Sequence, residues 1–157
     1  MVGVGGVVIA DGRALLVRRG SEPLKGQWSI PGGTLELGET IVQGVERELH
    51  EETGLDVRVL ELIEVFERVF PTDGPADGVL NGPAGKPMGA AAPRPRYHFV
   101  VLDYLCERAG GELRAGSDVS DVALAREDEL ASYHLTEAAT RVLRKAFDMT
   151  RTRHRRP

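Results

Sequence analysis

The chain has 157 residues, with 20 Lys and Arg against 24 Asp and Glu and a formal net charge of −4. This length predicts one domain with a single core, and the acidic balance argues against a stable complex with nucleic acid. Cys106 is the only cysteine, which excludes an internal disulfide and favours a reducing, cytoplasmic compartment.

Two β-rich runs open the chain, at residues 2–10 and 13–19. Asp11 and Gly12 separate them and form a strong hairpin signal, so the two runs are predicted to pair. Because Asp11 and Arg13 interrupt the apolar stretch, we predict neither a signal peptide nor a membrane-spanning helix here, and we expect no membrane partner.

Three residues near the end of the second run are candidate substrate contacts. Arg18 and Arg19 supply the cations that a polyphosphate needs, although such residues equally keep a strand end soluble. Trp28 is the only tryptophan and stands beside a Gly-rich loop. It is predicted either to stack on a nucleobase or to pack in the core.

Residues 40–54 carry the pattern of an amphipathic helix. Thr40 and Gln43 have the form of a capping box, and Gly54 is a natural C-terminal stop. At about 100° per residue, the apolar positions fall in one sector that is predicted to pack on a sheet. These positions are Ile41, Val42, Val45 and Leu49.

Three carboxylates crowd one side of this predicted helix. Glu48, Glu51 and Glu52 are spaced i, i+3, i+4, and Glu52 falls inside the apolar sector. A carboxylate there is costly to desolvate unless it is paired or bound to a metal ion. Helix geometry leaves two interpretations open, namely a solvated acidic face paired with Arg47, or a seat for a divalent cation that removes the repulsion.

The stretch from Gly33 to Leu55 resembles the signature of the Nudix hydrolases. Every specified position matches, namely Gly33, Glu39, Arg47-Glu48-Leu49, Glu51-Glu52 and Gly54-Leu55. The resemblance implies a Nudix-like α/β/α sandwich with a mixed β-sheet. It also implies dependence on Mg²⁺, or on Mn²⁺ in its place, and hydrolysis of a nucleoside diphosphate linked to another group.

The same resemblance implies roles for individual residues. The carbonyl of Gly33 and the carboxylates of Glu48, Glu51 and Glu52 are the implied metal ligands. Glu39 and Arg47 are the remaining charged positions of the signature, and their pairing would orient the ligands. Glu52 or Glu51 is the residue of the helix that we expect to act as general base, unless a loop carboxylate takes that role.

The middle of the chain is predicted to be a hairpin with a long insertion. Residues 57–70 suit one long strand, or two with a bend, and carry Glu61, Glu64 and Glu67 at a spacing of three that does not keep one face of a strand. Residues 71–95 hold six Pro and five Gly, so we predict an insertion that is mobile without ligand and able to cover the site.

The region from 96 to 106 is the clearest core strand, and Arg96 at its start is a candidate substrate contact. Beyond the turn at Gly110-Gly111, Asp118 and Asp121 are candidates for a further ligand or base. A Gly-Ser-Asp turn explains Asp118 equally well.

The C-terminal region is predicted to be helical. A short helical turn is expected at 127–130, followed by a helix with Thr136 as its N-cap. This helix should pack on the face of the sheet opposite the acidic helix, with Val142, Leu143 and Phe147 on its apolar side. We predict one domain over residues 1–150 and a frayed basic tail over 151–157.

These observations predict a Mg²⁺-dependent hydrolase that cleaves a phosphoanhydride bond in a small nucleotide. ADP-ribose or a nucleotide sugar is the favoured substrate, because two features resemble the hydrolases of these compounds. They are Pro71, which lies downstream of the Nudix signature, and the acidic turn beyond Gly110-Gly111. The alternatives are a pyrophosphohydrolase of oxidised nucleoside triphosphates and a nucleotide-sensing module without catalysis. The sensor is disfavoured because every carboxylate of the Nudix signature is present. A homodimer is compatible with the sequence.

Overall fold

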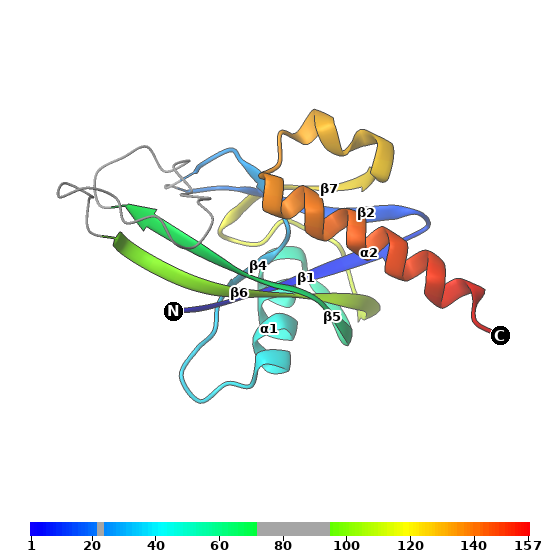
Figure 1. Ribbon diagram of the computed structural model, residues 1–157, viewed down its shortest axis with the longest axis horizontal. Helices are drawn as coiled ribbons and strands as arrows, with labels where there is room; N and C mark the ends of the chain where they lie inside the picture. The colour runs from blue at the N-terminus through cyan, green and yellow to red at the C-terminus, as the bar shows by residue number, and fades with distance from the viewer. Residues whose placement is uncertain (22–23, 72–94) are drawn as a thin grey trace, which may run out of the picture.

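A seven-stranded mixed sheet runs through the middle of the molecule (Figure 1). The computed structural model describes residues 1–21, 24–71 and 95–157. The strands are paired in the order β3-β2-β1-β6-β5, with β4 on β1 and β7 on β2. They are β1 (Val2–Ala10), β2 (Arg13–Arg19), β3 (Trp28–Ser29), β4 (Gly32–Thr34), β5 (Leu55–Pro71), β6 (Pro95–Gly111) and β7 (Val119–Arg126). Because β1 and β6 are parallel and the other pairs antiparallel, the mixed sheet is confirmed.

Two helices cover the two faces of this sheet (Figure 1). The helix α1 (Ile41–Thr53) buries Val45 and Leu49 in one apolar cluster. The helix α2 (Glu137–Arg155) buries Val142, Leu143 and Phe147 in another, beside the 3₁₀ segment η1 (Glu127–Tyr133). The predicted α/β/α sandwich is therefore confirmed. Within the described residues, no helix has the length and hydropathy that spanning a bilayer requires.

The first hairpin forms as predicted, with Ala10 opposite Arg13. Asp11 and Gly12 have φ angles of 52° and 71°, the left-handed conformation that a type I′ turn requires at both central positions. The helix α1 also begins as predicted, because Thr40 Oγ1 accepts from the backbone N–H of Gln43 at 3.2 Å. The turn and the cap together fix where the β-sheet and the acidic helix start.

One apolar position of α1 was predicted wrongly. Val42 is 44% exposed instead of packed on the sheet. The loop before the helix packs on the other side of the first turn, where a Cβ added at Gly44 would lie 2.6 Å from Leu35 Cδ1. Val42 projects away from this contact, so its side chain is left partly exposed at the start of the helix.

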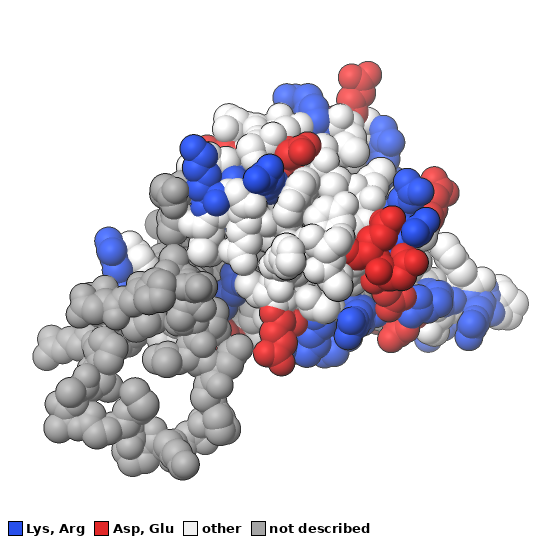
Figure 2. Space-filling view, turned by 90° about the horizontal axis from the view of Figure 1, so that it is seen from above, with Lys and Arg blue, Asp and Glu red and all other residues white. Residues whose placement is uncertain are grey.

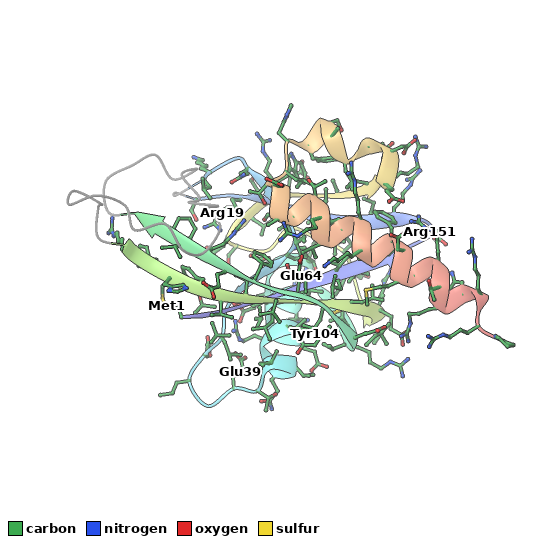
Figure 3. The ribbon with its side chains drawn as sticks, viewed as in Figure 1. Met1, Arg19, Glu39, Glu64, Tyr104 and Arg151 are labelled. Carbon is green, nitrogen blue, oxygen red and sulfur yellow. The ribbon has the colours of Figure 1, made fainter. Side chains whose placement is uncertain are left out.

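The prediction that Glu61 and Glu64 lie on different faces of their strand was also wrong. A register shift between them adds one residue to β5, so both carboxylates face α2. Glu64 accepts from Arg141 at 3.0 Å and from Lys145 at 3.1 Å (Figure 3), and Glu61 lies 3.5 Å from Arg153. These ion pairs tie β5 to α2.

The C-terminal end is more ordered than predicted. α2 continues to Arg155, and Arg151 pairs with Glu127 at 2.7 Å and with Asp148. Acidic and basic side chains are interleaved on the face seen in Figure 2. The frayed tail predicted from residue 151 is therefore helical over most of its length, although its residues are exposed as expected.

The long hairpin is formed by β5 and β6, whose paired ends are Pro71 and Pro95. The predicted insertion between them, with its expected mobility and its role as a cover, lies at residues 72–94, outside the described residues.

Candidate active site

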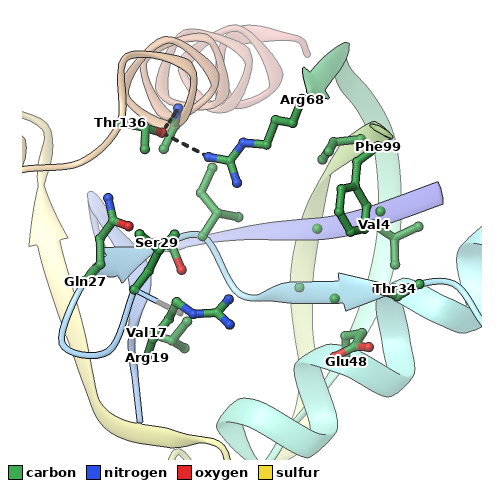
Figure 4. Close-up of a pocket in the computed structure, with 18 of the residues that line it drawn as sticks. Val4, Val17, Arg19, Gln27, Ser29, Thr34, Glu48, Arg68, Phe99 and Thr136 are labelled. Atoms are coloured by element: carbon green, nitrogen blue, oxygen red, sulfur yellow. Dashed lines mark hydrogen bonds between the residues drawn. The ribbon is translucent and has the colours of Figure 1, made fainter. Parts of the chain in front are cut away.

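A cavity of about 880 Å³ opens between the acidic helix and the start of α2 (Figure 4). One wall carries Glu48 and Glu52 of α1 together with the glycines of β4. The opposite wall comes from β5, β6 and the N-terminal end of α2. The site therefore joins groups from both faces of the sheet at one of its ends.

Arg47 connects the carboxylates of the acidic helix to the loop before it. Its Nε donates to Glu39 Oε1 at 2.7 Å and its Nη2 to Glu39 Oε2 at 3.0 Å, a bidentate pair. Its Nη1 donates to Glu48 at 2.8 Å and to Glu51 at 3.3 Å, and its Nη2 also reaches the Thr34 carbonyl at 3.1 Å. The hydrogen bonds between Arg47 and Glu39 raise the pKa of Arg47 and lower the pKa of Glu39. The guanidinium therefore fixes the orientation of Glu48.

Glu52 is the most perturbed carboxylate of the helix. Its Oε2 accepts from the backbone N–H of Gly32 at 2.9 Å. Burial raises the pKa of Glu52 to about 7, and the charge of Glu48 acts in the same direction. Burial also raises the pKa of Glu48. Two desolvated carboxylates thus face one cavity, and the charge of Glu48 disfavours the ionisation of Glu52.

Gly33 is required by the position of Glu48. A Cβ added at Gly33 would overlap the Glu48 carboxylate, which lies directly against the backbone there. Carboxylate and backbone oxygens are the donors that Mg²⁺ and Mn²⁺ prefer, and they suit thiophilic metals poorly. The chemistry of the donors and their mutual repulsion fit a hard divalent cation.

Glu51 is placed differently from its two neighbours. Its side chain is 57% exposed, and it does not line the cavity. In the described part of the chain, no three acidic, His or Cys side chains converge closely enough to hold an ion. Because Mg²⁺ keeps several waters and shares its ligation with substrate phosphates, a site with few protein ligands still suits it.

Four of the five predicted substrate contacts line the cavity, namely Arg19, Trp28, Arg96 and Asp118. Arg18 does not line the cavity, so its contact with substrate stays a prediction. Successive side chains of a strand point to opposite faces, so only one of the two neighbouring arginines reaches the cavity. The Nε of Arg18 donates instead to the Gly26 carbonyl at 3.1 Å.

Trp28 packs against the core, which is one of its two predicted roles, and stacking on a nucleobase stays a prediction. Its ring meets the Tyr133 ring edge-on, with centroids 5.2 Å apart and an interplanar angle of 86°, and it packs against the α2-side cluster. It also lines the cavity. Asp121 does not line it, because its Oδ1 accepts from the backbone N–H of Val122 at 2.9 Å.

Two charged residues of the opposite wall, Arg68 and Asp103, were not predicted from the sequence. Asp103 is only 4% exposed, and burial raises its pKa to about 6. A lone Asp in the most apolar strand of the chain was the available signal, because charged side chains are rarely buried without a purpose. For Arg68 there was no comparable signal, since β5 carries charges along its length.

Known proteins resemble this chain over most of its length. The family described as "NUDIX domain" matches residues 1–147. An "ADP-ribose pyrophosphatase" of Methanocaldococcus jannaschii is 33% identical over 120 residues, which cover 76% of this chain and 58% of that protein. The chain thus spans little more than half of that relative. The "Nucleoside triphosphatase NudI" of Escherichia coli is 29% identical over 139 residues, covering 85% of this chain and 87% of that protein.

The fold agrees with solved structures. The crystal structure of a MutT NUDIX hydrolase from Burkholderia pseudomallei superposes with a TM-score of 0.68 and 27% identity, covering 92% of this chain and 95% of that one. The family match over residues 1–147 includes the acidic helix and the strands around it. The chain therefore belongs to the NUDIX family.

Proposed function

We propose that the chain is a pyrophosphohydrolase that depends on Mg²⁺, or on Mn²⁺ in its place. Its substrate would be a nucleoside diphosphate joined to another group, either ADP-ribose or a nucleotide sugar. One observation carries this proposal, namely that the desolvated carboxylates of Glu48 and Glu52 share a cavity with the guanidinium group of Arg19 (Figure 4). Paired acidic and basic walls suit a phosphoanhydride that is bound with a cation.

The residues that would hold the cation are Glu48 and Glu52, the Gly33 carbonyl and, after rotation of its side chain, Glu51. When bound, the cation neutralises charge on the phosphate oxygens and lowers the pKa of water. Arg47 acts on this site indirectly, because its bonds to Glu39 and Glu48 hold the Glu48 carboxylate in place. Such orienting residues typically change activity by about 10- to 100-fold when they are replaced.

Glu52 is the proposed general base. Its carboxylate lies in the cavity beside the residues that would hold the cation, and burial raises its pKa in the absence of that cation, which makes it the more basic of the candidate carboxylates. It would remove a proton from the water that attacks one phosphorus. The bond from that phosphorus to the bridging oxygen then breaks, and the other phosphate leaves with the electron pair. Glu51 is the second candidate for the general base. It is adjacent to Glu52 in sequence, but its side chain does not line the cavity.

The choice of substrate is supported by similarity to the relative named ADP-ribose pyrophosphatase. The nucleoside triphosphatase of Escherichia coli supports the main alternative, and the chain covers more of that relative's length. A sensor without catalysis is less well supported, because Glu48, Glu51 and Glu52 are all present.

A panel of nucleotides separates these possibilities. We would incubate the protein with ADP-ribose, a UDP-sugar and nucleoside triphosphates, with and without Mg²⁺, and separate the products by chromatography. We expect Mg²⁺-dependent formation of AMP and ribose 5-phosphate from ADP-ribose, or of UMP and a sugar phosphate from the UDP-sugar. Pyrophosphate released only from triphosphates would select the alternative substrate. Tight binding without any product would overturn the proposal in favour of a sensor.

A further inference from the structure

The cavity wall opposite the acidic helix is built from alternating residues of β5 and β6. Phe66 pairs with Val101 and Arg68 with Phe99, so these side chains share one face of the sheet. Asp103 lies two residues beyond Val101 and therefore on the same face. All five line the cavity. The wall thus combines aromatic rings with the buried acid Asp103 and the half-buried base Arg68.

The Asp103 carboxylate occupies space that is left by a glycine on the neighbouring strand. Asp103 pairs with Gly5 of β1, and a Cβ added there would overlap its Oδ1. The carboxylate is 4% exposed, yet among the described residues none donates a hydrogen bond to it. Burial raises its pKa to about 6, so at neutral pH it is ionised and only accepts hydrogen bonds. Since no buried side-chain oxygen of the described residues lacks a partner, the Asp103 oxygens are accessible from the cavity, where a donor from a ligand can reach them.

Arg68 supplies donors beside this acceptor. Its Nη2 donates to Thr136 Oγ1 at 3.4 Å, at the long end of the hydrogen-bond range, as Figure 4 shows. A guanidinium carries five N–H donors in one plane, so this single contact leaves most of them available to a ligand. Burial lowers the pKa of Arg68, and the charge of Asp103 opposes that change. The positive charge of Arg68 and the negative charge of Asp103 therefore nearly cancel, and the pair offers donors next to an acceptor.

The charge of Asp103 disfavours a phosphate at this position of the wall. The carboxylate of Asp103 repels an anion that approaches Arg68. A neutral planar group satisfies both charged residues if its edge offers a donor next to an acceptor. Nucleobases with an exocyclic amino group place the donor on the exocyclic atom and the acceptor on the ring nitrogen beside it, whereas bases that carry only oxo groups have the reverse order. Fixed positions of Asp103 and Arg68 distinguish the two orders, and aromatic side chains such as Phe66 and Phe99 suit a planar ring.

The location also fits a part of the substrate that is not cleaved. Asp103 pairs with Gly5, which pairs with Gly32, whose N–H is bonded to Glu52. Two strand spacings, about 10 Å, therefore separate the backbone at Asp103 from the backbone at Gly32. Asp103 and Glu52 therefore contact different strands, with β1 between them, so a group bound at Asp103 is a different part of the substrate from the one bound at Glu52.

We propose that Asp103 and Arg68 form a nucleobase subsite that selects bases with an exocyclic amino group over bases that carry only oxo groups. Asp103 accepts from the amino group, and Arg68 donates to the neighbouring ring nitrogen or carbonyl. This inference rests on the proposed function, because it assigns the base end of the same nucleotide substrate. It applies equally to a nucleoside diphosphate derivative and to a triphosphate.

Binding of nucleoside monophosphates tests this subsite without hydrolysis. We would measure by calorimetry the dissociation constants of two matched pairs, AMP with IMP and CMP with UMP. A buried acceptor left without its donor weakens binding by about 10- to 100-fold, so we expect at least one amino-bearing member to bind at least about tenfold more tightly than its oxo partner. Equal binding within both pairs, or no binding by either pair at millimolar concentration, would overturn the proposal.

Asp103→Asn gives the second measurement. The substitution keeps the shape of the side chain but adds an N–H donor, so the preference for the amino-bearing base should fall to about onefold or reverse. Asp128→Asn, which changes an exposed carboxylate on η1, is the control and should retain the preference. If the correctly folded D103N protein keeps the wild-type preference, the assignment to Asp103 is wrong. A protein that discriminates between bases but hydrolyses no nucleotide would refute the proposed function and leave this subsite standing.

Discussion

Glu52→Gln should lower turnover by about 10²- to 10⁴-fold while leaving the fold intact. Removal of a general base typically has an effect of this size. The amide oxygen of Gln can still accept from the Gly32 N–H, so the structural bond at 2.9 Å is retained. Steady-state kinetics at saturating Mg²⁺ measures the loss, and Glu46→Gln on the same helix is the matched control because Glu46 does not line the cavity. Unchanged turnover in the E52Q protein would remove Glu52 from the chemistry.

The same variant has a second signature in the metal-free protein. The pKa of Glu52 is about 7 in the folded state and 4.5 ordinarily, so between these values the native state binds more protons than the unfolded state. The free energy of unfolding therefore decreases as pH rises from about 4.5 to about 7, by at most about 1.4 kcal/mol per pH unit from this group. Denaturant unfolding at several pH values should show a shallower decrease in E52Q. Equal slopes in both proteins would contradict the buried, protonated state of Glu52.

Arg47→Ala should reduce activity by about 10- to 100-fold and raise the Mg²⁺ concentration needed for half of the maximal rate. The substitution removes the bidentate bond to Glu39 and the bond to Glu48 at 2.8 Å, so Glu48 is no longer oriented. Arg47→Lys keeps the charge but lacks the planar fork, and we expect it to restore only part of the loss.

The Mg²⁺ titration distinguishes positioning from simple stabilisation. Arg126→Ala removes a surface arginine that pairs with Asp128 and Glu129, and it should leave the titration unchanged. If Arg47→Ala lowers the unfolding temperature but keeps the wild-type Mg²⁺ dependence, Arg47 supports the fold and does not position Glu48.

Local sequence signals predicted the elements that local interactions determine. The hairpin at Asp11-Gly12 needs only its turn residues, and the start of α1 needs only Thr40 and Gln43. The faces of β5 were predicted wrongly because its register shifts arise from pairing with β6. Such a shift depends on residues distant in sequence, and a strict alternation cannot show it.

The candidate site divides in the same way. The acidic helix was predictable, because Glu48 and Glu52 lie one turn apart and their spacing alone brings them together. The opposite wall was not, because Arg68 and Asp103 are brought into one cavity by the pairing of three strands. Gly5 is also needed at its position, because a side chain there would overlap the Asp103 carboxylate. The Nudix signature does not include this glycine.

The dependence of hydrolysis on Mg²⁺ tests most directly whether the acidic helix carries the chemistry. We would titrate Mg²⁺ into chelator-treated wild-type and Glu48→Gln proteins and follow product formation from the best substrate of the panel. Wild type should be inactive in chelator and reach a saturating rate. Glu48→Gln should need at least about tenfold more Mg²⁺ for half of its maximal rate, since it loses one charged ligand. A wild-type rate that is the same in chelator as in saturating Mg²⁺ would contradict the assignment of the helix as a metal site.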